Sequence, residues 1–156
     1  MNEKKLLKYA VDYLSKYESS KKNLSDVLKR KVFRLKLSVV EKNFLIKNIK
    51  NIVLKLEKNN FIDDNRYSLS KISSLSRLGK SKNFISNYLL KKGIDNFVIQ
   101  NNFEIYKENN DDWEINSAVT YAKKKKLLES HESYEKKLAK MARAGFSYNI
   151  CKKILG

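Results

Sequence analysis

The chain contains no proline and only four glycines among its 156 residues. Proline breaks helices and glycine weakens them, so both residues that commonly interrupt helical segments are scarce. Apolar residues recur at steps of three and four, whereas the alternation of apolar and polar residues typical of half-buried strands is rare. The sequence therefore predicts an all-α protein.

Cysteine and histidine are nearly absent, with one of each, Cys151 and His131. One cysteine cannot form an internal disulfide, and these two residues alone cannot hold a metal ion. We expect no metal, no cofactor and a reducing, cytoplasmic setting. Charged residues interrupt residues 1–14, so neither a signal peptide nor a membrane span is predicted there.

Basic residues outnumber acidic ones by 34 to 17, which gives a net charge of +17. Lysine, asparagine and isoleucine abound, as an A/T-rich genome would produce without selection for binding. Whatever its origin, such a surface attracts polyanions. Residues 1–60 carry +10, residues 61–110 carry +3 and residues 111–156 carry +4. We expect the first segment to attract DNA directly and the other two to face a protein partner.

Nine helical segments are predicted from apolar stripes and from polar residues that can cap helices. The stripes place Tyr17, Phe44, Phe84, Leu90 and Phe97 among the residues expected to face a core. The expected caps are Ser38, Ser81, Asp95, Ser147 and the acidic pairs Asp63–Asp64 and Asp111–Asp112. The predicted segments begin near residues 1, 24, 39, 64, 82, 96, 113, 134 and 148.

Three stretches share one pattern of apolar residues, basic residues and a turn: residues 24–33, 85–94 and 137–146. The pattern predicts three tandem three-helix repeats over residues 1–62, 63–110 and 111–156. Modules this small bury little apolar surface alone, so we expect them to pack into an elongated, curved array. The first repeat has Val32 where the others have glycine, and its third helix is expected to be extended.

Three motifs in this order resemble the RecX family of RecA recombinase regulators. They are NFIDDNRY at residues 60–67, GKSKNFISNYLLKKGI at residues 79–94, and KMARAGFSYNI at residues 140–150. The resemblance covers nearly the whole chain and implies three three-helix repeats. It also implies a protein of recombination, DNA repair and the SOS response that binds the RecA filament on single-stranded DNA. Such a protein usually inhibits the filament's ATPase, its strand exchange and its extension.

Basic residues are the candidate contacts with this filament, because arginine and lysine bind carboxylates and phosphates. Candidates for attracting DNA are Lys21, Lys22, Lys29, Arg30, Lys31 and Arg34. Candidates for binding the RecA–DNA filament are Arg66, Tyr67, Lys71, Arg77, Lys80, Lys82, Lys91, Lys92, Lys123, Lys124, Lys136, Lys140 and Arg143. For any single lysine, the competing interpretation is that it is only a solvated residue on the exposed face of a helix.

No residue is expected to perform catalysis, since neither acidic pair is accompanied by a histidine or a phosphate loop. Cys151 lies on an apolar stripe and is expected to be buried. We therefore predict a monomeric, non-enzymatic regulator that does not bind membranes. The alternative is a basic helical protein that binds DNA without RecA.

Overall fold

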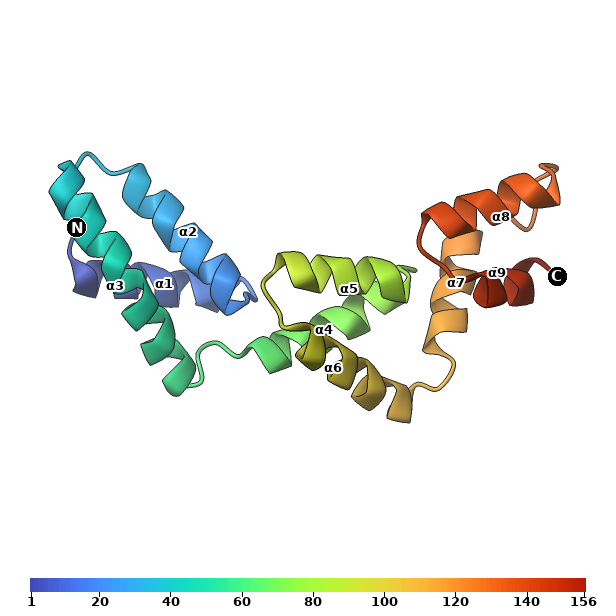
Figure 1. Ribbon diagram of the computed structural model, residues 1–156, viewed down its shortest axis with the longest axis horizontal. Helices are drawn as coiled ribbons and strands as arrows, with labels where there is room; N and C mark the ends of the chain where they lie inside the picture. Colours follow the sequence, from blue (N-terminus) through green and yellow to red (C-terminus); the bar gives the residue numbers. More distant parts are fainter. The chain divides into compact units, whose positions relative to one another are not determined.

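The computed structural model describes all 156 residues as nine α-helices joined by short turns (Figure 1). The predicted all-α class is confirmed, and every helix expected from the sequence is present. None of the nine combines the length and the apolar character that a membrane span requires. The chain forms two compact units, residues 1–67 and residues 68–156.

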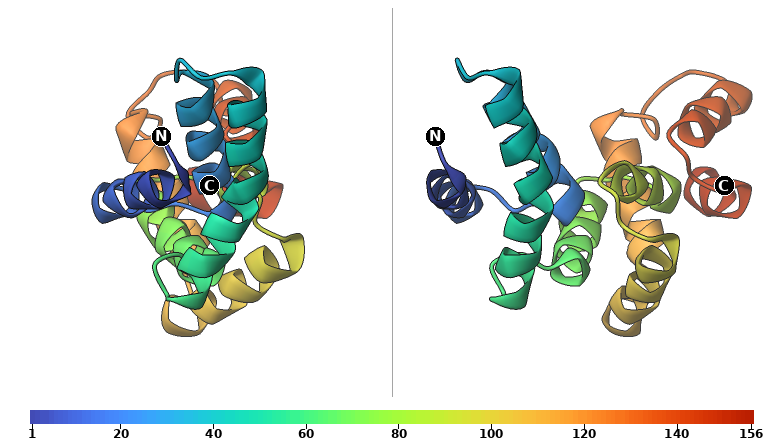
Figure 2. Two further views of the ribbon diagram at one scale, coloured as in Figure 1. Left: turned by 90° about the vertical axis from the view of Figure 1, so that its left-hand side faces the viewer. Right: turned by 60° about the vertical axis from the view of Figure 1, so that its left-hand side comes forward.

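The first unit contains α1 (Glu3–Lys16), α2 (Lys21–Phe33) and α3 (Val39–Lys58). Helices α2 and α3 pack along each other as a hairpin, and α1 packs against both (Figure 1, Figure 2). The apolar stripes of the three helices meet in one core, which holds Leu6, Ala10, Leu24, Leu28, Val32, Leu45, Ile49, Ile52, Val53, Leu56 and Ile62. At 20 residues α3 is the longest helix, as expected.

Side-chain oxygens close the start of each helix in this unit. Asn2, Ser20 and Ser38 accept hydrogen bonds from backbone N–H groups of α1, α2 and α3. Helix α2 has a second cap from a distant part of the chain, because Asp64 Oδ1 accepts the Lys21 N–H at 2.8 Å. This bond ties the start of α4 to the start of α2.

The second unit carries most of α4 and five further helices. Helix α5 packs against α6, and α9 packs against both α7 and α8 (Figure 1). Near the C-terminus the core holds Ala118, Ala122, Leu127, Met141, Phe146 and Cys151. The helices are α4 (Asp64–Arg77), α5 (Lys82–Lys91), α6 (Asn96–Asn109), α7 (Trp113–Lys124), α8 (Tyr134–Arg143) and α9 (Tyr148–Leu155).

Two serines bind the α4–α5 turn to α7 and to the end of α8. Ser81 Oγ caps α5 by accepting the Phe84 N–H at 3.1 Å, and it donates to the Ala144 carbonyl at 2.8 Å. Ser117 Oγ of α7 donates to the Lys80 carbonyl. Gly145 has φ +99°, and a Cβ there would collide with Ser81 Oγ, so this close approach requires glycine. Helices α5, α7 and α8 thus share one polar junction.

The second helix of each proposed repeat has the same local arrangement. Helices α2, α5 and α8 are capped by Ser20, Ser81 and Ser133. Eight residues after each cap lies a fully buried side chain, and these are Leu28, Leu89 and Met141. This correspondence is consistent with a tandem repeat of three helices.

Several sequence predictions about individual residues are wrong. Tyr17, Phe44, Phe84, Leu90 and Phe97, expected in the core, are exposed. Tyr17 lies just beyond the end of α1. The other four lie on helix faces that no neighbouring helix covers, because a small unit has few neighbours to cover a second apolar face of a helix.

The second acidic pair also behaves differently from expectation. Asp63 caps α4 by accepting the Arg66 N–H at 3.1 Å, but the Asp112 side chain makes no capping hydrogen bond at α7. The backbone of Asp112 has φ −96° and ψ 24°, outside the extended conformation in which a capping side chain reaches the helix N–H groups. Val32, the residue in place of glycine, lies within α2 and is fully buried, so α2 continues through that position.

Candidate interaction surfaces

The outer face of α2 presents exposed cations. Lys22, Lys29 and Arg30 lie on the same side of the helix because seven or eight residues make about two turns. Lys22 Nζ also pairs with Asp26 Oδ2 at 3.2 Å, one turn away. Arg34 is exposed just beyond the end of the helix. We call Lys22, Lys29, Arg30 and Arg34 the basic ridge of α2.

The other two residues predicted to attract DNA have partners within the unit. Lys21 Nζ pairs with Glu57 Oε2 at 2.7 Å, and this hydrogen bond raises the pKa of Lys21. Lys31 Nζ lies 4.9 Å from the centre of the Tyr9 ring, a cation–π contact between α2 and α1. Burial raises the pKa of the nearby Asp64 carboxyl. Lys21 and Lys31 therefore hold helices together as well as adding charge.

The motif around the start of α4 divides into an exposed and a buried part. Arg66 is exposed, and its guanidinium donates to the Asn60 carbonyl at 3.4 Å. Tyr67 is only 6% exposed, so its ring belongs to the core and offers little surface to a partner. Lys71, one turn further along α4, is half-buried. Of these three, Arg66 is the residue most accessible to a filament.

Three of the predicted contacts in the second unit lie against aromatic rings. Lys80 Nζ is 4.7 Å from the Phe84 ring centre, and Lys82 Nζ is 5.2 Å from that of Phe103. Lys92 Nζ lies 5.5 Å from the Tyr88 ring centre. Such contacts hold an ammonium group over the face of a ring, where its charge still attracts anions. Lys91 is exposed on the same helix, α5.

Two of the predicted cations near the C-terminus form hydrogen bonds with other residues of the chain. Lys124 Nζ donates to the Leu78 carbonyl at 2.8 Å, and Lys140 Nζ pairs with Glu132 Oε1. This hydrogen bond from Lys140 lowers the pKa of Glu132. The exposed members of the predicted set here are Lys123, Lys124, Lys136 and Arg143.

A polar cleft of about 840 Å³ lies among α4, α6 and α7. Its lining includes Arg77 with Asp111 and Asp112, beside the Trp113 ring. No group of three or more His, Cys, Asp or Glu side chains in the structure could hold a metal ion. Asp111 and Asp112 therefore line the cleft beside Arg77, and nothing at the cleft is arranged as a metal centre.

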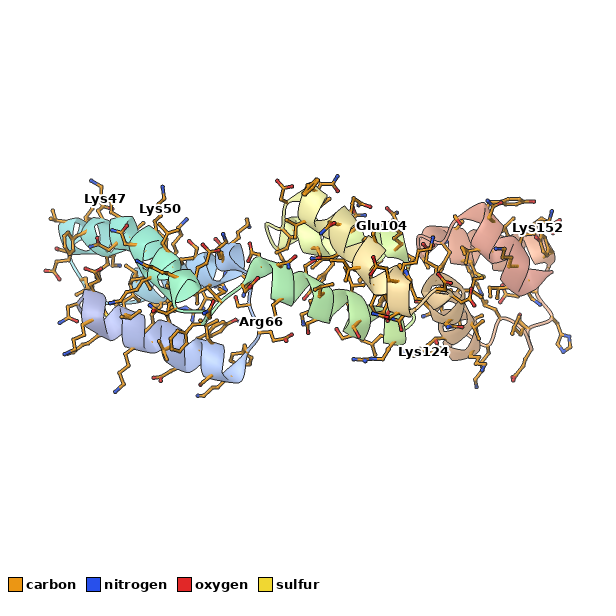
Figure 3. The ribbon with its side chains drawn as sticks, turned by 90° about the horizontal axis from the view of Figure 1, so that it is seen from below. Lys47, Lys50, Arg66, Glu104, Lys124 and Lys152 are labelled. Carbon is orange, nitrogen blue, oxygen red and sulfur yellow. The ribbon has the colours of Figure 1, made fainter.

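The sequence does not predict the exposed positions of two lysines and one phenylalanine of α3. Lys47 and Lys50 of α3 are exposed and point away from α1 (Figure 3). Phe44 is exposed on the same helix and lines an apolar groove of about 750 Å³ between α3 and the start of α1. Phe44 was assigned to the core because apolar periodicity alone does not tell which of two apolar stripes has a neighbour.

Cys151 is fully buried, as expected, and its Sγ lies 3.7 Å from the Phe146 carbonyl oxygen. Burial raises the pKa of this thiol, which makes the thiolate scarce. His131 is exposed in the turn before α8. These positions do not form a nucleophile–base pair.

Comparison with known proteins decides the family. No family model matches the chain. The regulatory protein RecX of Myxococcus xanthus (strain DK1622) is 30% identical over 154 residues, covering 94% of this chain and 81% of that protein. The chain belongs to the RecX family. A crystal structure of RecX from Lactobacillus salivarius has the same fold, with a TM-score of 0.72 and 27% identity over 98% of this chain and 94% of that one.

Membership of the RecX family agrees with the resemblance seen in the sequence motifs, and all three motifs lie at structural junctions. Residues 79–94 contain the Ser81 cap and residues 140–150 contain Gly145, and these two residues contact each other. The first motif, residues 60–67, contains the Asp64 carboxylate that caps α2. The motifs therefore contain positions that hold helices together, and they also contain exposed cations, which are Arg66, Lys80, Lys91 and Arg143.

Proposed function

We propose that this RecX-family chain is a non-enzymatic regulator that binds the RecA filament on single-stranded DNA. In this role it inhibits the filament's ATPase, strand exchange and extension. The observation that carries the proposal is its 30% identity, over almost its whole length, with a protein named as the regulatory protein RecX. The exposed cations support it, because a RecA–DNA filament presents phosphates that attract such a surface.

The basic ridge of α2 is proposed to contact DNA phosphates. Lys29 and Arg30 are exposed and adjacent, so both can approach one backbone without unfolding the helix. Arginine can donate two parallel hydrogen bonds to a phosphate, and lysine adds a less directional charge. The exposed cations of the second unit, with Arg66, are proposed to contact the filament too.

We further propose that residues 1–62, 63–110 and 111–156 act as three helical modules. The matching caps and buried residues of α2, α5 and α8 support this division. Modules in series present cations at several points along the chain, which suits a long, periodic target better than a compact one. A monomer working in the cytoplasm suffices for this mode of binding.

The experiment is a binding titration on surface-immobilised single-stranded DNA, with and without RecA and a slowly hydrolysed ATP analogue. We expect the chain to bind the RecA-coated DNA at lower concentration than bare DNA. Equal binding to both surfaces, lost to the same extent with salt, would instead show a DNA-binding protein that acts without RecA. The exposed basic ridge is the observation that favours this second candidate.

A further inference from the structure

The first unit leaves an apolar groove open between α1 and α3. Leu7 and Ile52 line it together with Phe44, whose side chain is 62% exposed. Ile52 belongs to the core, so the groove is continuous with the packed interior of the unit. An apolar side chain inserted there would be removed from water and would contact side chains that are already held in place.

The charged residues that line the groove are mostly basic. Lys4 of α1 and Lys55 of α3 stand at its two sides, and Glu3 is the one acidic residue among those that line it. Asn2 and Asn51 supply amide groups beside them. A partner that lays an apolar anchor into the groove can therefore place carboxylates next to both lysines.

We propose that this groove binds an acidic segment of a protein partner, through an apolar side chain flanked by aspartate or glutamate. The proposal rests on the proposed function, and it assigns the partner segment to the RecA protein of the filament. A nucleic acid fits less well, since the apolar side chains of Leu7, Phe44 and Ile52 offer nothing to a phosphate backbone and the lining has no arginine to pair with it. Lys47 and Lys50 point away from α1 (Figure 3), so they enhance the local positive field from outside the groove.

This assignment changes the expected role of the N-terminal segment. Its net charge of +10 predicts that it attracts DNA, whereas the groove gives the same segment a surface for protein. The basic ridge is made by α2 and the groove by α1 and α3, so each surface can be altered without touching the other. The two surfaces can therefore be tested by separate substitutions.

The test compares Phe44→Ser with the matched control Phe97→Ser in binding to RecA filaments on single-stranded DNA. Both phenylalanines are exposed on helices, Phe97 at 78%, so neither change removes a core residue. We expect Phe44→Ser to weaken filament binding about tenfold, as loss of a central apolar anchor does, and Phe97→Ser to leave it unchanged. The charge-reversal pair Lys4→Glu with Lys55→Glu should weaken it as much.

Wild-type binding serves as the reference that separates the two proposals. If the wild-type chain does not bind RecA filaments, the proposed function fails. If the wild type binds and Phe44→Ser binds equally well, the groove assignment alone is overturned. The assignment is likewise overturned if Phe44→Ser weakens binding to bare single-stranded DNA as much as binding to filaments, since the groove would then contact the nucleic acid.

Discussion

Lys126 follows α7 in a left-handed conformation, with φ at 53°. The Leu127 N–H donates to the Ala122 carbonyl at 2.9 Å, which closes the helix in the way that glycine usually permits. For a residue with a Cβ this conformation costs about 1 kcal/mol or more. The Lys126 side chain is exposed, so replacing it removes strain without removing packing.

We therefore expect Lys126→Gly to raise the free energy of unfolding by about 0.5–1 kcal/mol, measured by urea denaturation followed by circular dichroism. Asn60, which has φ 62° after α3, is the matched comparison. Asparagine tolerates this conformation, so Asn60→Gly should give a smaller gain. A loss of stability in Lys126→Gly would show that the turn is not strained.

The ion pair between Lys140 and Glu132 should make the stability of the folded state depend on pH. The hydrogen bond from Lys140 lowers the pKa of Glu132 below its usual 4.5. A lowered pKa means that the pair stabilises the folded state at neutral pH, and that this contribution is lost as the pH falls through the pKa of the folded state. We expect ¹³C NMR titration to find Glu132 ionised at lower pH than an ordinary glutamate.

In Lys140→Gln the pKa of Glu132 should rise toward 4.5, whereas Lys136→Gln should change it little, because Lys136 contributes least to the shift. The same pKa in wild type and Lys140→Gln would mean that the pair does not form in solution.

Burial of single side chains could be predicted only in part. Leu6, Leu28 and Met141 follow from helical periodicity, but Phe44 and Phe97 lie on equally regular positions and are exposed. Pairing with distant groups was not predictable, because nothing in the local sequence indicates that Lys124 reaches the Leu78 carbonyl. Such contacts depend on how helices pack, which periodicity does not specify.

Among helical elements, α5 begins at the junction that joins it to α8. Ser81 is 1% exposed and makes two hydrogen bonds, one to the Phe84 N–H and one to the Ala144 carbonyl. We expect Ser81→Ala to lower the free energy of unfolding of the second unit by about 2 kcal/mol, because it removes a helix cap and leaves the half-buried Ala144 carbonyl without its donor. Chemical denaturation measures this loss.

The control is Ser38→Ala, which removes the cap of α3 at an exposed position. It should cost about 1 kcal/mol, as a cap does alone. Hydrogen exchange should also become faster in α8 in Ser81→Ala and remain unchanged there in Ser38→Ala. Equal effects of the two changes would mean that the bond to Ala144 contributes nothing.

Helix boundaries were largely predictable because side-chain caps are local. Ser38, Ser81 and Ser147 each accept a backbone N–H three residues ahead, as their positions predict. Asp112 shows the limit, since the right residue type in the wrong backbone conformation makes no cap. The cap that Asp64 provides to α2 was unpredictable, because its two residues are 43 positions apart.

For the whole molecule, the net charge of +17 matters through the cations that remain exposed. If Lys29 and Arg30 contact phosphates, Lys29→Gln with Arg30→Gln should reduce the slope of log affinity against log salt on single-stranded DNA by about 1.4. Lys152→Gln with Lys153→Gln removes the same charge from exposed positions on α9 and should change the slope less. Equal slopes for the two pairs would show that only the total charge affects binding and that Lys29 and Arg30 do not contact phosphates.

The most direct test of the proposed function is the DNA-dependent ATPase of RecA filaments, measured as this chain is added over a range of salt concentrations. We predict that ATP hydrolysis falls as the chain binds, that salt reverses the inhibition, and that the Lys29→Gln/Arg30→Gln variant inhibits less. An ATPase rate that stays unchanged at concentrations well above those of RecA, with no binding to the filament, would contradict the account.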